Sequence, residues 1–227
     1  MKIAFIGSGH VGQALAKLFI KAGHSVVLTN RHGKDSLLPV TSKLGSAAQA
    51  ADINSLGDDL DLFVLAIPFN GVNDLDGNLL KGKKVIDASN YFPQRDGRIP
   101  KLINHEISSS QMLADYFKGS TIVKAFNTIP VSELEDLANF ENKSERIAIP
   151  IAGDDVKFKN IVAELIDQIG FNAYDAGNLK NSFTIQADGP IFGLTVDKKR
   201  IVEKNCINEI KNNDMFLPRK GFHNSGV

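Results

Sequence analysis

Three glycines near the N-terminus have a spacing that suits phosphate binding. They lie in Gly7-Ser8-Gly9-His10-Val11-Gly12, directly after the apolar run Lys2–Ile6 and before an amphipathic stretch that ends at Gly23. The first glycine of such a turn permits a tight bend, the second lets a pyrophosphate approach the backbone, and the third lets the helix pack closely on the strand. Because a second apolar run, Ser25–Thr29, follows, the pattern predicts a strand-helix-strand unit that binds a dinucleotide at the helix N-terminus. All six residues of the turn are candidate cofactor-binding residues, and the alternative is a purely structural glycine turn.

The residues after the second strand favour NADP over NAD. A site for NAD usually has Asp or Glu there to hold the ribose hydroxyls, whereas this chain has Asn30-Arg31-His32 and no acidic residue before Asp35. A carboxylate would repel a 2′-phosphate, while the guanidinium of Arg31 can pair with it. Asn30 can add a neutral donor. The alternative is that Arg31 is an ordinary exposed loop arginine.

Composition and charge exclude several classes of function. Lys and Arg number 26, as do Asp and Glu, so the net charge is zero and nucleic acid is not an expected partner. The single cysteine, Cys206, allows no intrachain disulfide, and no spacing of His, Cys or carboxylates suggests a metal site. The chain begins with a strand rather than a signal peptide, and no apolar run reaches membrane-spanning length. These features predict a soluble, cytoplasmic protein.

Three further apolar runs predict a doubly wound parallel sheet of α/β class. They cover residues 61–68, 83–90 and 121–130, and helical or loop segments separate them. Ligands of such sheets bind outside the carboxyl ends of the strands. We therefore expect the loops that leave these strands to line a nicotinamide site. The candidate residues in these loops are Ile67, Pro68, Ser89, Asn127 and Thr128.

The remaining segments predict a Rossmann-sized unit over residues 1–144, a small α/β extension over 145–202 and a polar tail over 203–227. Residues 34–56 predict a helix and a short third strand, whereas residues 91–109 predict a loop and 110–117 a helix. Ser132 and Glu135 have the spacing of a capping box that opens a short helix. In the extension we expect a strand at 146–153, a helix capped by Asp154-Asp155, and a final strand at 171–176, either extending the main sheet or forming a small lobe against it.

The sequence resembles the NADP oxidoreductase, coenzyme F420-dependent family, which has a Rossmann-type NAD(P)-binding fold. Members move hydride between NADPH and a deazaflavin, and the same fold forms the reductase domain of six-transmembrane metalloreductases. The matching segments are Ile3–Gly12, Thr29-Asn30-Arg31, Leu65-Ala66-Ile67-Pro68, Val123–Pro130, Ala152-Gly153-Asp154-Asp155 and Asp175-Ala176-Gly177. Two places depart from the archaeal deazaflavin reductases: Asn127 stands where they have a histidine, and the segment Phe183–Phe192 differs.

The resemblance implies an NADPH-dependent reductase of a deazaflavin (coenzyme F420) or a flavin-like ring. Hydride transfer between stacked rings needs orientation and exclusion of water more than a strong acid or base. Asn127 and Thr128 could fix the nicotinamide carboxamide or the acceptor ring, or only satisfy the backbone. Tyr91-Phe92 and Phe192 could stack on an acceptor or pack in the core, and Asp87 could be an acid or a helix cap.

Two other functions remain open at this stage. An imine or keto-acid reductase needs a proton donor, for which Lys124 is the candidate. A non-catalytic NADP sensor would keep Gly7–Gly12 and Arg31 but have a filled nicotinamide edge. The expected partners are a small-molecule hydride acceptor and, in a homodimer, a second copy of the chain.

Overall fold

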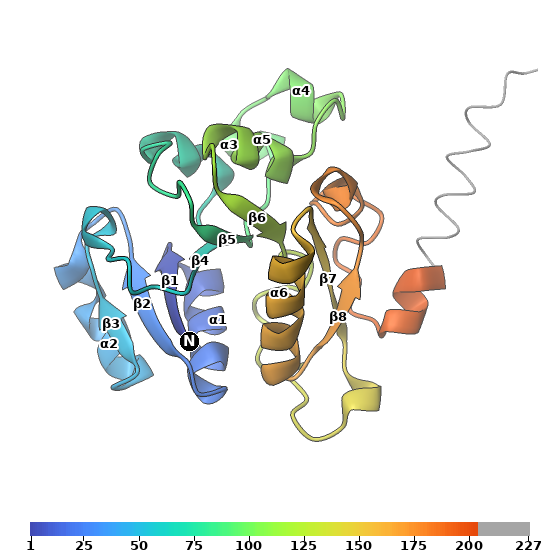
Figure 1. Cartoon of the computed structure of the whole chain (residues 1–227). Helices are drawn as coiled ribbons and strands as arrows, with labels where there is room; N and C mark the ends of the chain where they lie inside the picture. The colour runs from blue at the N-terminus through green and yellow to red at the C-terminus, as the bar shows by residue number, and fades with distance from the viewer. Residues whose placement is uncertain (204–227) are drawn as a thin grey trace, which may run out of the picture.

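One eight-stranded sheet organises the protein, as seen in a computed structural model that describes residues 1–203 (Figure 1). The strand order is β3-β2-β1-β4-β5-β6-β7-β8, and among these neighbours the one antiparallel pair is β6 with β7. The strands are β1 (Lys2–Ile6), β2 (Ser25–Thr29), β3 (Ala48–Ala50), β4 (Leu62–Leu65), β5 (Lys84–Asp87), β6 (Thr121–Lys124), β7 (Ala148–Gly153) and β8 (Asn172–Asp175). The order reverses between β1 and β4, which is where a doubly wound sheet opens a ligand crevice.

Helices cover both faces of this sheet. The α-helices are α1 (His10–Lys21), α2 (Leu38–Leu44), α3 (Pro93–Asp96), α4 (Pro100–Ile103), α5 (Ser109–Tyr116) and α6 (Val156–Gln168). Short 3-10 turns are η1 (Lys34–Leu37), η2 (Ile53–Ser55), η3 (Phe69–Asp74), η4 (Lys143–Glu145) and η5 (Leu179–Thr184). The fold class predicted from the sequence, a mostly parallel α/β sheet with helices on both faces, is confirmed.

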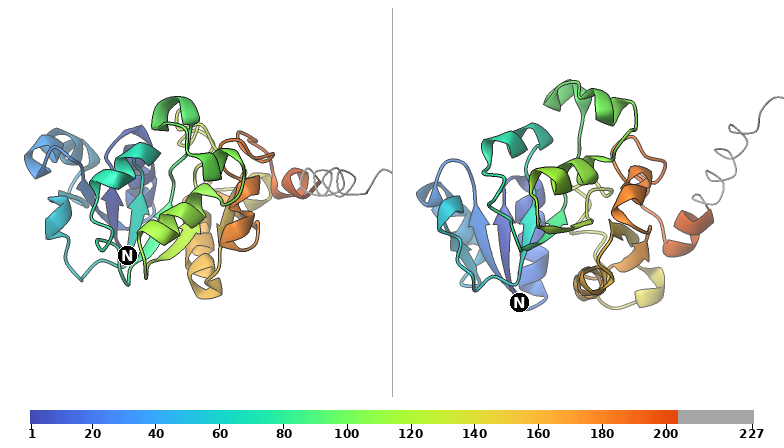
Figure 2. Two further views of the ribbon diagram at one scale, coloured as in Figure 1. Left: turned by 90° about the horizontal axis from the view of Figure 1, so that it is seen from above. Right: turned by 45° about the horizontal axis from the view of Figure 1, so that its top comes forward.

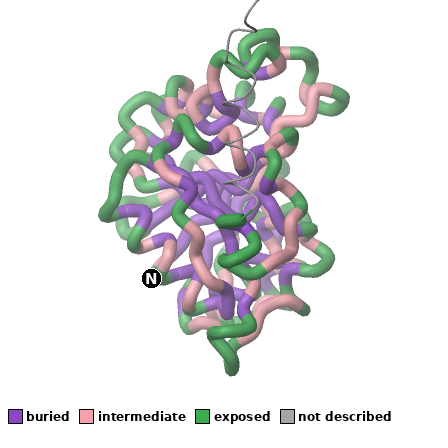
Figure 3. The backbone as a smooth tube through the Cα atoms, turned by 90° about the vertical axis from the view of Figure 1, so that its right-hand side faces the viewer, coloured by how far each residue is buried: buried purple, intermediate pink, exposed green. Residues whose placement is uncertain are grey.

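Side chains alternate between the two faces along each strand, as the two-residue period of a strand requires. In β1, Ile3 and Phe5 join the core beneath α1 and α6, whereas Ala4 and Ile6 join the core beneath α5. All four are buried, and the buried strands form the centre of the molecule in Figure 3. The glycine turn after β1 is therefore anchored on a strand that is packed on both sides.

Strands β4 and β6 are shorter than the apolar runs predict. The runs cover 61–68 and 121–130, but the strands end at Leu65 and Lys124. After β6 the backbone of Phe126 adopts φ +65°, a left-handed conformation that a strand cannot contain. Ala66 and Ala125, the first residues after these strands, still donate backbone hydrogen bonds to the neighbouring strand, and the residues that follow them become available to line a site.

Two predictions for the connecting segments are wrong. Residues 131–137 form successive turns and no helix, and Glu135 forms an ion pair with Lys17 of α1 instead of completing a capping box with Ser132. The segment expected to be loop contains α3 and α4, each of which is a single turn with proline at its first position. Proline has a fixed φ that suits this position, so it starts these helices.

The other helix predictions hold. Helix α5 begins one residue before the predicted start, and a capping box between Ser108 and Gln111 fixes its N-terminus. In the extension, Asp155 caps α6 by accepting a hydrogen bond from the backbone N–H of Phe158 at 2.7 Å. Strands β7 and β8 continue the main sheet beyond β6, so the extension does not form a separate lobe.

The chain then returns toward the middle of the molecule. In both views of Figure 2, η5 lies beside α5. The hydroxyl of Ser182 lies 2.8 Å from that of Ser108, and Ser108 Oγ donates to the carbonyl of Leu179. The polar tail from residue 204 onward and Cys206 lie outside the described residues. Within residues 1–203, no helix has the length and apolar character needed to cross a membrane.

Candidate functional site

The three glycines of the turn have different surroundings. Gly7 has φ +109°, and a Cβ on it would lie 2.4 Å from the carbonyl oxygen of Ala66; a Cβ on Gly12 would lie 2.2 Å from the carbonyl oxygen of Gly7. By contrast, a Cβ on Gly9 would meet nothing within 4 Å. The first and third glycines are therefore required by the fold, while the second leaves open space next to the helix N-terminus. A bound phosphate needs space at this point.

A cavity of about 750 Å³, which we call the switch-point cavity, opens between the glycine turn, the end of β2 and the end of β4. Its walls include seven of the predicted site residues: Gly7, Ser8, Gly9, Asn30, Arg31, Ile67 and Pro68. The remaining walls are Ile6, Thr29, His32, Ile53, Ala66, Asn70, Gly71, Asp74 and Leu75. The side chain of Gln13 donates to the carbonyl of Ser8 at 2.6 Å and so holds the turn from outside the cavity.

The loop after β2 presents Arg31 at the rim of this cavity. Asn30 turns the chain, because its Oδ1 accepts from the backbone N–H of His32 at 2.8 Å and its Nδ2 donates to Ser36 Oγ at 2.9 Å. Arg31 is exposed, and its Nε lies 3.3 Å from Nε2 of His32. No acidic side chain of residues 1–203 forms an ion pair with Arg31. An exposed guanidinium without a carboxylate partner is available to an anionic ligand.

A second cavity of about 310 Å³, the strand-end cavity, lies beyond β5 and β6 next to the first turn of α1. Its walls are Val11, Ala88, Asn90, Phe126, Asn127, Thr128, Ile129, Pro130, Val131, Phe192 and Gly193. None of these side chains is titratable. The cavity therefore offers shape and neutral hydrogen-bonding groups, but its walls hold no acid or base.

Three predicted site residues line neither cavity. His10 is an exposed first residue of α1, and Gly12 is needed for packing. Ser89 is buried, and both its backbone N–H and its hydroxyl donate to Oδ1 of Asp87, at 2.9 and 2.6 Å. The position of Ser89 does not support the prediction that it lines the site. Its polar groups are hydrogen-bonded to the buried carboxylate of Asp87 and do not line either cavity. Its neighbour Asn90 lines the cavity.

Asp87 and Lys124 form a buried ion pair behind the strand-end cavity. Lys124 Nζ lies 3.0 Å from Oδ2 of Asp87 and also donates to the carbonyl of Ser89 at 2.9 Å. The same carboxylate oxygen accepts from Ser110 Oγ of α5 at 2.6 Å. Both charged side chains are fully buried, so neither can reach a substrate. Their visible role is to fix the loop that carries Asn90.

Asn90 and Asn127, which both line the strand-end cavity, are hydrogen-bonded to each other. Asn90 Nδ2 donates to the carbonyl of Asn127 at 3.0 Å, and Asn127 Nδ2 donates to Oδ1 of Asn90 at 3.1 Å. Asn127 Nδ2 also donates to the carbonyl of Ile185 at 2.6 Å, and the N–H of Gly193 donates to the carbonyl of Thr128 at 3.0 Å. The segment after η5 is in this way attached to the ends of the sheet strands and closes one side of the cavity.

An aromatic and charged cluster forms the rim of this closure. The rings of Phe92 and Phe192 meet edge to face with centroids 6.3 Å apart, and the guanidinium of Arg95 lies over Phe92. Arg95 also forms an ion pair with Asp96 and donates to the carbonyl of Asn90. Burial alone would raise the pKa of Asp96, but hydrogen bonds from Arg95 and from the backbone N–H groups of Phe92 and Asn70 outweigh it and lower that pKa. The carboxylate therefore stays charged and keeps the rim in place.

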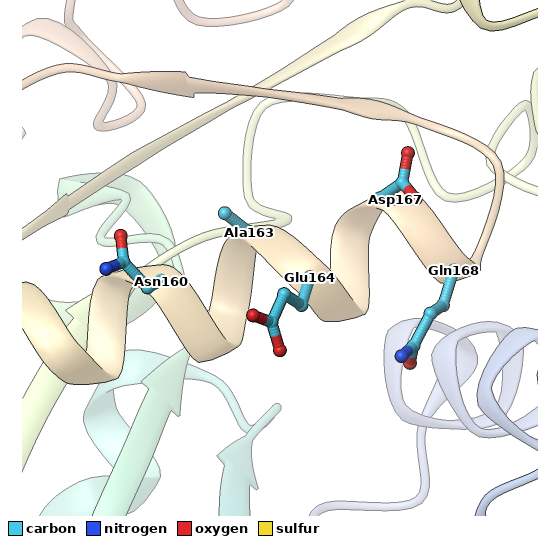
Figure 4. A pocket seen from close by; sticks show the side chains of 5 residues that line it. All are labelled: Asn160, Ala163, Glu164, Asp167 and Gln168. Carbon is cyan, nitrogen blue, oxygen red and sulfur yellow. The ribbon is translucent and has the colours of Figure 1, made fainter.

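A third hollow runs along the outside of α6 (Figure 4). Its walls are Asn160, Ala163, Glu164, Asp167 and Gln168, all from this one helix. Asp167 is already paired with Arg146 and Lys143, and Gln168 Oε1 accepts a hydrogen bond from Nε2 of His24. The polar groups at one end of the hollow are thus engaged within the fold, and we assign it no chemistry.

Sequence reasoning missed several residues that shape the site. Gln13 supports the glycine turn, Phe126 redirects the chain in its left-handed conformation, and Ile185 and Gly193 come from the returning segment. No local signal predicts a contact such as that between Asn127 and Ile185.

The strand order, the glycine turn at the switch point and the open helix N-terminus together define a dinucleotide-binding protein of Rossmann type. A family model described as "NADP oxidoreductase coenzyme F420-dependent" matches residues 2–91. Over these residues the chain is similar to the coenzyme F420-dependent NADP oxidoreductase family, and the relatives described next extend the similarity over most of the chain.

The relatives are similar at moderate identity. The F420-dependent NADP reductase of Methanocaldococcus jannaschii is 29% identical, over 88% of this chain and 94% of that protein. The metalloreductase STEAP3 of Rattus norvegicus is 28% identical over 82% of this chain, which spans only 36% of that longer protein. A solved structure of the hypothetical protein SMa0349 from Sinorhizobium meliloti superimposes with a TM-score of 0.75 at 29% identity, covering 87% of this chain and 96% of that one.

Proposed function

We propose that this protein is an NADPH-dependent oxidoreductase that transfers hydride between NADP(H) and a deazaflavin or flavin-like ring. The single observation that carries the proposal is the neutral strand-end cavity, which lies beside the glycine turn and has no titratable side chain in its walls. Hydride transfer between two conjugated rings requires orientation and shelter from water, and it needs no acid or base beside the reacting atoms. The family-model match over residues 2–91 and the similarity to the NADP reductase relative support the same class of reaction.

The described residues fit NADP. Gly9 leaves open space at the N-terminus of α1, where unpaired N–H groups and the helix dipole favour a pyrophosphate. Arg31, exposed and without an acidic partner, would hold the 2′-phosphate, and Asn30 keeps the Arg31 loop in shape. Val11 and the ends of β5 and β6 would surround the nicotinamide. When bound, NADPH supplies the hydride, while the chain orients the ring and excludes water.

The alternatives are less well supported by this geometry. A reductase of imines or keto acids needs a proton donor near the substrate, but Lys124 is fully buried and committed to Asp87 and Ser89. A sensor without activity would have its nicotinamide edge filled by side chains. Here a cavity of about 310 Å³ remains between the strand ends and the returning segment.

The proposal can be tested by following NADPH oxidation with a panel of acceptors. The panel contains a deazaflavin, FMN, FAD, a ferric chelate and a cyclic imine, and Gly9→Val serves as the control that should fold without binding the cofactor. We expect turnover with at least one ring acceptor, and NADPH deuterated at either C4 position should deliver label from one face only. Tight NADPH binding without turnover of any ring acceptor would instead favour a sensor, and turnover of the imine alone would favour the second alternative.

A further inference from the structure

Two buried oxygens at the strand-end cavity have no hydrogen-bond partner. They are Oδ1 of Asn127 and Oγ1 of Thr128, on residues that are only 4% and 2% exposed and that both line the cavity. An unsatisfied buried polar group is costly, so native proteins rarely retain one without a reason. Two unpartnered oxygens on adjacent residues in the wall of a cavity indicate that a bound ligand supplies their hydrogen bonds.

The orientation of the Asn127 amide is determined by its neighbours. Its Nδ2 donates to the carbonyl of Ile185 at 2.6 Å and to Oδ1 of Asn90 at 3.1 Å, and both of these partners only accept. Asn90 is itself fixed because its Nδ2 donates to the carbonyl of Asn127. A rotated amide would place Oδ1 against two other oxygens. The free atom of Asn127 is therefore an acceptor, which calls for an N–H donor on the ligand.

The backbone that carries these residues is strained. Phe126, directly before Asn127, is buried with φ +65°, a conformation that costs a bulky residue energy and is usually found where function requires it. The backbone carbonyl of Thr128 accepts a hydrogen bond from the N–H of Gly193. The side-chain hydroxyl of Thr128 has no hydrogen-bond partner. A hydroxyl can donate to a ligand carbonyl. Two consecutive residues of the wall thus carry one buried acceptor and one buried hydroxyl donor that have no partner within the described residues.

We propose that Asn127 and Thr128 read the carboxamide of the nicotinamide: Asn127 Oδ1 accepts from its amide N–H₂, and Thr128 Oγ1 donates to its carbonyl oxygen. This inference rests on the proposed NADP function and assigns a specificity role to two residues of the same site. The carboxamide is the polar substituent of the nicotinamide ring, and it carries both an N–H donor and a C=O acceptor on one carbon. Asn127 Oδ1 as acceptor and Thr128 Oγ1 as donor match these two groups of the carboxamide.

The test compares binding of NADP⁺ with binding of its 3-acetylpyridine analogue, in which a methyl group replaces the amide nitrogen. Wild-type protein should bind NADP⁺ about tenfold more tightly, because the analogue leaves Asn127 Oδ1 without a donor. Asn127→Ala should weaken NADP⁺ and reduce this preference to near unity. Thr128→Val should weaken both nucleotides by a similar factor, since both have the carbonyl, and Thr128→Ser should restore binding.

Two controls separate this inference from the function on which it rests. Asn160→Ala, in the exposed hollow on α6, should leave the tenfold preference unchanged, and 2′,5′-ADP, which lacks the nicotinamide, should bind equally to all variants. An unchanged preference in Asn127→Ala, with normal 2′,5′-ADP binding, would overturn the carboxamide assignment alone. An Asn127→Ala variant that raises only the KM of the ring acceptor would also overturn the carboxamide assignment. If Asn127→Ala does not fold, two other results would overturn that assignment. They are the absence of any preference for NADP⁺ in the wild type and unchanged NADP⁺ binding by Thr128→Val. Failure of the wild type to bind either nucleotide would overturn the proposed function as well.

Discussion

Lys124 and Asp87 face each other at the ends of two neighbouring strands, with 3.0 Å between Nζ and Oδ2 and no solvent exposure on either side chain. The carboxylate accepts four hydrogen bonds in total, from Lys124, Ser110 and the N–H and hydroxyl of Ser89. Because every acceptor site is in use, the pair fixes the loop that leads to Asn90. A buried, charged network thus supports a cavity whose own walls are neutral.

Removing one partner of this pair should be strongly destabilising. Lys124→Met leaves the charge of Asp87 buried and uncompensated, and such changes cost about 3–5 kcal/mol of unfolding free energy. The measurement is denaturant unfolding, with the double variant Lys124→Met/Asp87→Asn as the comparison. We expect the double variant to recover part of the loss, since it removes the unpaired charge. Equal stability of the two variants would show that charge burial is not the cause.

The three glycines of the turn should respond differently to substitution. Gly9→Val adds a side chain that meets no protein atom within 4 Å of its Cβ, at φ −71° and ψ −171°, where any residue is tolerated. NADPH affinity should therefore collapse while the melting temperature changes little. Gly12→Ala places its methyl group 2.2 Å from the carbonyl oxygen of Gly7, so here stability should fall as well. Normal NADPH affinity in Gly9→Val, measured by calorimetry, would mean that the turn is only structural.

Arg31 should determine the choice between the two nicotinamide nucleotides. Its guanidinium has no acidic partner within the described part of the chain, so its charge is free for the 2′-phosphate. Arg31→Ala should weaken NADPH binding by about 1.5–3 kcal/mol, the range of a charge-assisted hydrogen bond, and leave NADH nearly unchanged. Titrations at two salt concentrations measure this, since the effect should shrink as salt rises. Equal losses for both nucleotides would show that Arg31 does not read the phosphate.

The sequence predicted the parts of the fold that depend on local patterns. The first strand-helix-strand unit and the capping of α6 by Asp155 follow from glycine spacing, apolar period and cap chemistry, all within a few residues. The glycine turn and Arg31 lie together at the switch-point cavity because strand order brings the ends of β1, β2 and β4 to one edge.

Where the sequence was misleading, distant contacts were decisive. Ser89 is drawn inward by Asp87 and the predicted helix at Ser132 is replaced by turns, with Glu135 paired to Lys17, 118 residues earlier. Asn127 is oriented by the carbonyl of Ile185, which lies 58 residues later. Such contacts depend on how finished elements pack, and no local period or motif encodes them.

His24 should make the stability of the protein depend on pH. It lies directly before β2, where Nε2 is 2.8 Å from Oε1 of Gln168 and Nδ1 is 3.2 Å from the N-terminal amine. Burial lowers the pKa of His24 below its ordinary value of 6.5 and outweighs the hydrogen bond with Gln168, which raises it. The N-terminal charge lowers this pKa further, and Asp61 raises it slightly. The folded state thus binds a proton on His24 less readily than the unfolded state does.

The sign of the effect follows from this difference. Because the pKa is lower in the folded state, the contribution of His24 to stability is complete above pH 6.5 and is lost as the pH falls below that value toward the folded pKa. We expect the unfolding free energy of the wild type to decrease between pH 7 and pH 5 more steeply than that of His24→Gln, which cannot titrate but can still hydrogen-bond to Gln168. Denaturant melts at half-unit steps of pH measure the two slopes. Identical slopes, or a wild type that gains stability on acidification relative to His24→Gln, would contradict the assignment.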